Sequence, residues 1–103
     1  MNLKIRLALF KSLCKIPKVL PGYNHNLNVD GVVFHVQTED RGGVSAYVET
    51  QVFVNGAIIH VEKLSYKQND KQDDIIRLMQ NQHKSVLKKL SQKSILGMER
   101  YIK

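Results

Sequence analysis

The sequence has few of the residues that specialised small domains depend on. It contains one cysteine and no tryptophan. A single cysteine excludes an internal disulfide, so the chain is not a disulfide-stapled secreted domain and fits a reducing compartment. Cys14 has no histidine or aspartate close by in sequence, and we therefore interpret it as a buried structural thiol and not as a nucleophile. These features favour a cytoplasmic location.

Long apolar runs are also missing. The longest uncharged apolar run in the N-terminal segment, residues 7–10, is followed at once by Lys11 and then by Lys15. Such a segment is too short and too charged to span a membrane or to act as a secretory signal. The sequence has no glycine-rich phosphate loop, CxxC pair, HExxH motif or nucleophile elbow. We therefore expect a protein that is not an enzyme and that binds no cofactor, metal or small-molecule substrate.

What the sequence does contain is ordinary for one soluble domain. It has 103 residues, of which 43% are hydrophobic and 24% charged. The net charge of +7 is concentrated at the two ends, because residues 1–18 hold five basic residues and no acid, whereas residues 23–66 are mildly acidic. A basic protein can bind nucleic acid, anionic lipid or an acidic partner. In this chain the positive charge lies on the two flanks and not on the central residues 23–66.

Residues 1–22 are predicted to form a basic amphipathic segment with a short helix; Pro17 disfavours helix at Ile16, and Pro21-Gly22 breaks the chain before the sheet. Apolar residues recur at helical spacing, and a second stripe is basic. Two interpretations remain open for residues 1–18, which either lie on an anionic membrane surface or pack on the domain or a partner. Packing is the interpretation that we favour. The apolar and basic stripes are Leu3, Leu7, Phe10 and Cys14, and Lys4, Lys11, Lys15 and Lys18.

Two β-hairpins are predicted between Tyr23 and Tyr66. Asp30-Gly31 and Asn55-Gly56 favour two-residue type I′ turns, which fix the register of the strands on either side. Alternation of side chains then predicts a core face and an opposite, mixed face. The predicted core face consists of Tyr23, Leu27, Val29, Val32, Phe34, Val36, Val48, Val52, Val54, Ile59 and Val61.

The mixed face is predicted from the same register. It puts Glu49 opposite Glu62 and Gln51 opposite His60, and carboxylates that face each other repel unless a cation or proton lies between them. The second hairpin is expected to overhang the first and to end in a tip, residues 52–59, that is apolar on both faces. Such a tip needs a cover, which is the N-terminal helix, a second copy of the chain or another protein.

A C-terminal helix is predicted over Gln72–Leu96, with Gly97 as its stop. Its apolar stripe is expected to lie on the core face of the sheet. The predicted fold class is therefore α+β, a four-stranded antiparallel sheet of two hairpins with a helix packed on one face. The domain would span residues 23–96, and residues 97–103 would form a loose tail. The stripe consists of Ile75, Ile76, Met79, His83, Val86, Leu87 and Leu90.

The histidines are the remaining candidates for chemistry. His25 and His83 both fall on core positions, and we expect them to be hydrogen-bonded core histidines close to one another. His35 and His60 fall on the mixed face beside glutamates, a set of donors that can bind zinc. The spacing between the strands does not bring these donors together, so we expect no metal site and interpret them as a polar surface patch.

Several segments carry a resemblance to a known group of proteins. They are Tyr23-Asn24-His25-Asn26, the run from Phe34 to Asp40 (FHVQTED), Thr50-Gln51-Val52-Phe53 with Gly56, Tyr66, Leu78-Met79 and Gln82-His83-Lys84. Over about residues 23–92 the chain resembles a family of small uncharacterised bacterial proteins of delta-proteobacteria and their gliding or predatory relatives. The resemblance implies no catalytic residues. It suggests a role in a polarity or motility complex with a small Ras-like GTPase.

The leading hypothesis is a non-enzymatic interaction or adaptor module that binds another protein or itself as a homodimer. The alternative is a nucleic-acid-binding protein that uses the basic flanks, with Tyr47, Phe53 and Tyr66 stacking on bases; Glu39, Glu49 and Glu62 on the same face would repel phosphates. The predicted protein-contact residues are Tyr47, Glu49, Gln51, Phe53, Ile58, His60, Glu62 and Leu64. The predicted contacts to an anionic partner are Lys4, Lys11, Lys15, Lys88, Lys89 and Lys93.

Overall fold

The computed structural model describes residues 22–102. The predicted N-terminal helix, with Lys4, Lys11, Lys15 and Cys14, lies outside the described residues. The described elements, in chain order, are β1 (Tyr23–Val29), β2 (Val32–Arg41), β3 (Tyr47–Val54), β4 (Ala57–Ser65), α2 (Gln72–Ser91) and the short 3-10 helix η1 (Leu96–Arg100).

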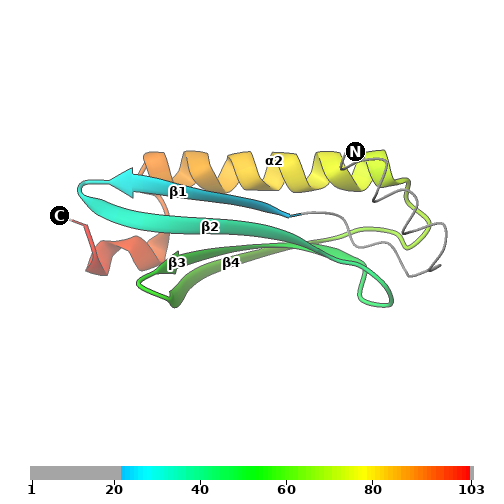
Figure 1. The fold of residues 1–103 in the computed structure, drawn as a ribbon, viewed down its shortest axis with the longest axis horizontal. Helices are drawn as coiled ribbons and strands as arrows, with labels where there is room; N and C mark the ends of the chain where they lie inside the picture. Colours follow the sequence, from blue (N-terminus) through cyan, green and yellow to red (C-terminus); the bar gives the residue numbers. More distant parts are fainter. Residues whose placement is uncertain (1–21, 103) are drawn as a thin grey trace, which may run out of the picture.

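The four strands form one antiparallel sheet in the order β1-β2-β3-β4. Figure 1 shows α2 running along one face of this sheet, where it contacts β1, β2 and β3. The opposite face of the sheet is not covered by any described element. The predicted α+β class, with two hairpins and a C-terminal helix on one face, is therefore confirmed.

Both hairpin turns have the predicted conformation. Asp30 and Gly31 have φ values of 53° and 85°, and Asn55 and Gly56 have φ values of 51° and 82°. Positive φ at both central residues defines a type I′ turn, whose twist matches that of the flanking strands. The first turn sets the predicted register, in which Val29 pairs with Val32 and each later pair follows in step up to Tyr23 and Thr38.

The register of the second hairpin differs from the prediction. Val54 pairs with Ala57 and Phe53 with Ile58, but Val52 then pairs with His60, because the register shifts by one residue at this point. A bulge of this kind inserts one extra residue into one strand and turns every later side chain to the other face. The predicted pairing of Glu49 with Glu62 and of Gln51 with His60 is therefore wrong.

The bulge replaces a repulsive pair with favourable neighbours. Glu49 pairs with Lys63 and Thr50 with Glu62. Val61, predicted to be in the core, points away from α2 and is 41% exposed. His60 and Glu62, predicted on the mixed face, share the α2 side of the sheet with their buried partners Val52 and Thr50.

The core lies between the sheet and α2 in two clusters. The larger cluster packs under the second half of the helix, and the smaller one under its first two turns. The larger cluster contains Val29, Phe34, Val36, Val52, Val54, Val86, Leu90, Ile95 and Met98. The smaller contains Val48, Ile75 and Met79, with Tyr23, Tyr66, Ile76 and Leu78 packed against it.

The C-terminal helix ends earlier than predicted. After Ser91 the chain enters a turn in which Lys93 has a φ of 56°. The Lys93 N–H donates to the Leu90 carbonyl at 3.0 Å, and the Ser94 N–H donates to the Lys89 carbonyl at 2.9 Å. These two bonds form a Schellman motif, which terminates a helix through a residue in the left-handed region. The predicted stop at Gly97 is therefore wrong.

The segment that follows is not a loose tail. Ile95 and Met98 are 3% and 0% exposed, and η1 lies against β4. Ile59 packs on the same cluster, next to the second hairpin turn. The predicted loose tail over 97–103 is thus wrong, and the apolar tip of the second hairpin is covered in part by residues 95–102 of this chain.

Candidate functional site

The face of the sheet that points away from α2, here called the outer face, is arranged in rows across the strands. One row contains His35, Phe53 and Ile58, and the next contains Gln37, Gln51 and Val61. Val33, Ile58 and Val61 are 53%, 52% and 41% exposed. The half of the outer face near the hairpin turns therefore exposes an apolar patch on β2, β3 and β4, beside exposed asparagines on β1.

The other half of the outer face holds four charged residues that pair with one another. The Arg41 guanidinium lies 3.0 Å from a Glu39 oxygen and 3.3 Å from a Glu49 oxygen. Lys63 lies 3.7 Å from the second Glu49 oxygen and 5.3 Å from the centre of the Tyr47 ring. Two acids and two bases thus neutralise each other, and the outer face presents little net charge despite the basic character of the chain.

The predicted protein-contact residues fall on two sides of the sheet. Five of the eight lie on the outer face and three on the α2 side, because of the bulge in β4. The outer-face residues are Tyr47, Glu49, Gln51, Phe53 and Ile58, and the residues on the α2 side are His60, Glu62 and Leu64.

Glu62 connects the edge strand β4 to the helix. Its carboxylate accepts hydrogen bonds from Lys89 Nζ and His60 Nε2, each at 2.8 Å. Burial by itself would raise the pKa of Glu62, but the hydrogen bonds and charges of Lys89 and His60 outweigh burial and hold this pKa below its usual value. His60 is therefore a partner of Glu62 and is separated by the sheet from His35, which bonds to Asn24 and Asn26.

Tyr66 also lies on the α2 side and not on the mixed face as predicted. Its hydroxyl donates to Asp40 Oδ1 at 2.6 Å and its ring packs on the smaller core cluster. Burial, followed by the hydrogen bond to Asp40, raises the pKa of Tyr66 to about 12. Tyr66 is therefore held in the structure and is not presented to bases in the way that the nucleic-acid alternative supposed.

A chain of hydrogen-bonded polar side chains runs from the exposed His25 on β1 into the core between the two apolar clusters. His25 on β1 and His83 on α2 are joined by a hydrogen bond of 2.6 Å between His25 Nδ1 and His83 Nε2. His83 Nδ1 lies 2.7 Å from Thr38 Oγ1, which lies 2.7 Å from Thr50 Oγ1. Thr50 donates to Gln82 Oε1 at 2.9 Å. The predicted contact between His25 and His83 is confirmed, and His83 is buried, but the prediction that His25 is a core histidine is wrong, because His25 is exposed on the edge strand β1.

The direction of these hydrogen bonds follows from the number of protons available. A threonine hydroxyl has one proton, and that of Thr50 goes to Gln82. Thr38 must therefore donate to Thr50, and His83 Nδ1–H must donate to Thr38. A neutral His83 then accepts at Nε2 from His25 Nδ1–H. The chain of hydrogen bonds thus fixes the tautomer of both imidazoles.

The geometry of the histidine pair is that of a hydrogen bond and not of a metal chelate. The ring centroids are 4.8 Å apart, so the rings meet nearly end to end across the 2.6 Å contact. Two ligands of one metal ion would instead converge on a common point beside them. Burial, and then the proximity of His25, lower the pKa of His83, which is 4% exposed. Within residues 22–102 no three metal-ligating side chains come together.

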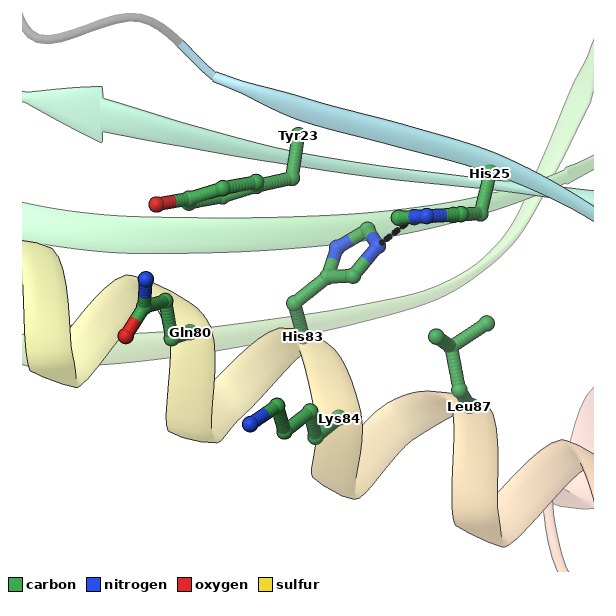
Figure 2. Close-up of a pocket in the computed structure, with 6 residues that line it drawn as sticks. All are labelled: Tyr23, His25, Gln80, His83, Lys84 and Leu87. Atoms are coloured by element: carbon green, nitrogen blue, oxygen red, sulfur yellow. Dashed lines mark hydrogen bonds between the residues drawn. The ribbon is translucent and has the colours of Figure 1, made fainter.

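A groove of about 380 Å³ opens beside this pair, between β1 and α2. Figure 2 shows Tyr23 and His25 pointing from β1 toward the helix, with Leu87 beyond His83 and with Gln80 and Lys84 along the helix. The groove combines an apolar surface, from Tyr23 and Leu87, with polar groups along one wall. The sequence did not point to it, because its lining comes from segments far apart in the chain.

The basic residues predicted to contact an anionic partner are only partly available for one. Lys89 pairs with Glu62, and Lys93 lies 2.7 Å from Asp30. Lys88 is exposed on α2. Of the described candidates, Lys88 alone is outside these ion pairs.

Comparisons with known proteins add no family assignment. No protein-family model, curated protein or solved structure matches this chain. The resemblance named above therefore stays a prediction. Among the helices of residues 22–102, none has the length and apolar character needed to cross a bilayer.

Proposed function

We propose that this protein is a non-enzymatic protein-interaction module whose outer face packs against the outer face of a second copy. The observation that carries the proposal is that α2 covers one face of the sheet, whereas the opposite face exposes Val33, Ile58 and Val61 around Phe53. An antiparallel sheet can leave one face in solvent, and an exposed apolar patch on such a face marks an interaction surface.

The charge layout of the outer face supports a second copy as the partner. Two copies of a chain with net charge +7 repel each other at most surfaces. On the outer face the four charges are already paired, so two such faces can approach without a conflict of like charges. The apolar patch of Val33, Phe53, Ile58 and Val61 at the other end then supplies the hydrophobic contact.

The size of the face is adequate for such an interface. Four strands about 4.8 Å apart, each contributing about eight residues, cover roughly 500 Å² of flat area. The corrugated accessible surface of the side chains is larger and approaches the ~800 Å² per partner of a standard interface. The Ras-like GTPase suggested by the family resemblance remains a prediction about a further partner of the same module.

The mass of the full chain in solution, measured by light scattering over a wide range of concentration, tests the proposal. We expect a dimer for the wild type and a monomer for the double variant Phe53→Glu, Ile58→Glu, because both substitutions place carboxylates in the apolar patch. Val33→Glu, at a position about as exposed as Ile58, should weaken the dimer without affecting the fold.

Val44→Glu provides the matched control, since Val44 is 94% exposed in the β2–β3 loop. It should leave the dimer intact, and circular dichroism should show all variants folded. A wild type that stays monomeric at the highest concentration, or a dimer that survives all three outer-face substitutions, would refute the proposal.

A further inference from the structure

The two edges of the sheet differ in how well they are protected against pairing with another strand. β4 carries the bulge next to His60, projects Lys63, and has η1 against it. Bulges, inward or projecting lysines and covering segments are the usual means of protecting an edge. β4 is therefore the edge of the sheet that is protected against pairing with another strand.

β1 has none of these protections within residues 22–102. It pairs with β2 through an uninterrupted register from Tyr23 to Val29, contains no proline and no charged residue, and pairs with no other described strand. Every residue of β1 except Val29 is at least partly exposed. A regular, uncharged edge strand presents a row of backbone N–H and C=O groups that can bind an extended segment.

The groove between β1 and α2 lies beside this free edge. A strand added to β1 would lie about 4.8 Å from it, with alternate side chains facing α2. Tyr23 and His25 point to that side from β1, and Leu87 points toward them from the helix (Figure 2). Lys84 lines the same groove, with its side chain lying along the helix. The side chains of an added strand would therefore enter a partly apolar groove while its backbone pairs with β1.

The walls of the groove are held in place before any segment binds. His83 is fixed by Thr38 on one side and by His25 on the other, at 2.7 Å and 2.6 Å. This hydrogen-bonded chain ties β1 to the helix at the middle of the groove. Binding to a preformed groove has a smaller entropic cost than binding to one that must first be ordered.

The charge of the helix indicates what kind of segment fits. Arg77, Lys84 and Lys88 follow each other at spacings of seven and four residues, which places them in one row on α2. All three are exposed, and within residues 22–102 none of them forms an ion pair. Lys84 itself lines the groove. The row is complementary to an acidic segment and not to the basic residues 1–18 of this chain.

We infer that the groove between β1 and α2 binds an extended acidic segment of a partner protein, which adds to β1 as a fifth strand. An apolar side chain of that segment packs between Tyr23 and Leu87, and its carboxylates face Lys84. This surface lies on the helix side and the β1 edge of the sheet, so it is separate from the outer face. The module therefore joins a second copy on one surface to an extended partner segment on another.

Selection from a phage-displayed library of random peptides of about ten residues, the length of a long strand, tests the inference on the full chain. Selected peptides should be enriched in aspartate and glutamate, and their acidic and apolar residues should be spaced two apart, because the side chains at positions i and i+2 of a strand share the face that points toward α2. The best peptide should lose at least about tenfold in affinity against Lys84→Glu, which corresponds to about 1.4 kcal/mol. The same peptide should bind the control variant Lys63→Glu, in which the change lies on the outer face, as tightly as it binds the wild type.

Backbone methylation separates strand addition from a contact of side chains alone. Methylation of the alternate amides that face β1 should abolish binding, whereas methylation of the other alternate amides should be tolerated. A library that yields no peptide, peptides without acidic enrichment, equal affinity for Lys84→Glu, or tolerance of both methylation patterns would each overturn the inference. The variant Phe53→Glu, Ile58→Glu should retain peptide binding, so the failure of either proposal can be recognised without the other.

Discussion

Thr38 and Thr50 show how a core position can hold a polar side chain. Both are fully buried on strands whose other inward residues are mostly valines. Strand alternation puts both threonines on the core face and so indicates that they are buried. Threonine is also common on the exposed faces of strands, so its residue type does not indicate burial. Only the position of Gln82 and His83 on the helix provides the hydrogen-bond partners that make their burial favourable.

His83 makes the stability of the fold dependent on pH. Burial lowers the pKa of His83 in the folded protein below the value of about 6.5 in the unfolded chain. As the pH falls below about 6.5, the unfolded chain takes up a proton that the folded protein does not, so the free energy of unfolding decreases. Urea unfolding between about pH 7.5 and 5.5 should show this loss, with a slope of at most about 1.4 kcal/mol per pH unit from this residue.

The variant His83→Gln should be less stable than the wild type at pH 7.5 but should lose less stability on acidification. His35→Gln is the matched control, because His35 bonds to Asn24 and Asn26 outside the core and should keep the wild-type slope. The pH range lies above the titration of Glu62, because Lys89 and His60 hold the pKa of Glu62 below its usual value. A slope that is the same in His83→Gln and the wild type would contradict the assignment.

At the scale of the elements, β4 shows where the register set by a hairpin turn stops applying. The Asn55-Gly56 turn does fix the first two pairs of the second hairpin, as predicted. The bulge after Phe53 then reverses the faces of His60, Val61 and Glu62. Nothing in the run Ala57-Ile58-Ile59 marks the extra residue, since both faces are apolar there. The bulge brings Glu62 to Lys89 and Lys63 to Glu49, two contacts that require the helix and the neighbouring strand.

A pair of engineered cysteines tests this register. In a Cys14→Ser background, Gln51→Cys with Val61→Cys should form a disulfide, because Gln51 and Val61 are opposite partners on the outer face. Gln51→Cys with His60→Cys, the pair expected without the bulge, should not, because the two side chains point to opposite faces. The electrophoretic shift after mild oxidation reports the outcome, and cross-linking of the second pair alone would show that the bulge is absent in solution.

The end of α2 is a second departure at this scale. A glycine is the usual residue in the left-handed position that ends a helix, which made Gly97 the natural candidate. The chain uses Lys93 instead, whose ammonium group pairs with Asp30 in the first hairpin turn at 2.7 Å. That contact joins two turns far apart in sequence, so no local pattern predicts it. Because the helix ends before Gly97, residues 95–102 can pack on the sheet.

At the scale of the whole molecule, one helix and a short C-terminal segment close the core together. α2 contacts β1, β2 and β3, and η1 contacts β4. Met98 and Ile95 complete the larger core cluster beside Val54. Figure 1 shows η1 next to the end of the sheet that carries both hairpin turns. Neither α2 nor η1 covers the outer face or the β1 edge. The two proposals above depend on these two surfaces.

Gly97 lies where η1 packs closely against β4. A Cβ atom at this position would lie 2.6 Å from the Ile59 carbonyl oxygen, a backbone atom that cannot move aside easily. Gly97→Ala should therefore destabilise the protein by about 1–3 kcal/mol, the usual cost of overpacking. Leu96→Ala, at a side chain that is 87% exposed, should change the stability by less than about 0.5 kcal/mol. Urea midpoints of the two variants measure the difference, and equal midpoints would show that η1 does not pack on β4 in solution.

The sequence by itself determined the fold class, the two type I′ turns, the register of the first hairpin and the approach of His25 to His83. These features depend on local backbone preferences and on hydrophobic alternation, which the order of residues specifies directly. The tertiary structure alone decided the bulge in β4, the helix end at Lys93, the packing of η1, and the groove between β1 and α2. Each of these depends on contacts between segments distant in the chain, such as Glu62 with Lys89 and Lys93 with Asp30, whose free energy appears only when the sheet and helix are assembled.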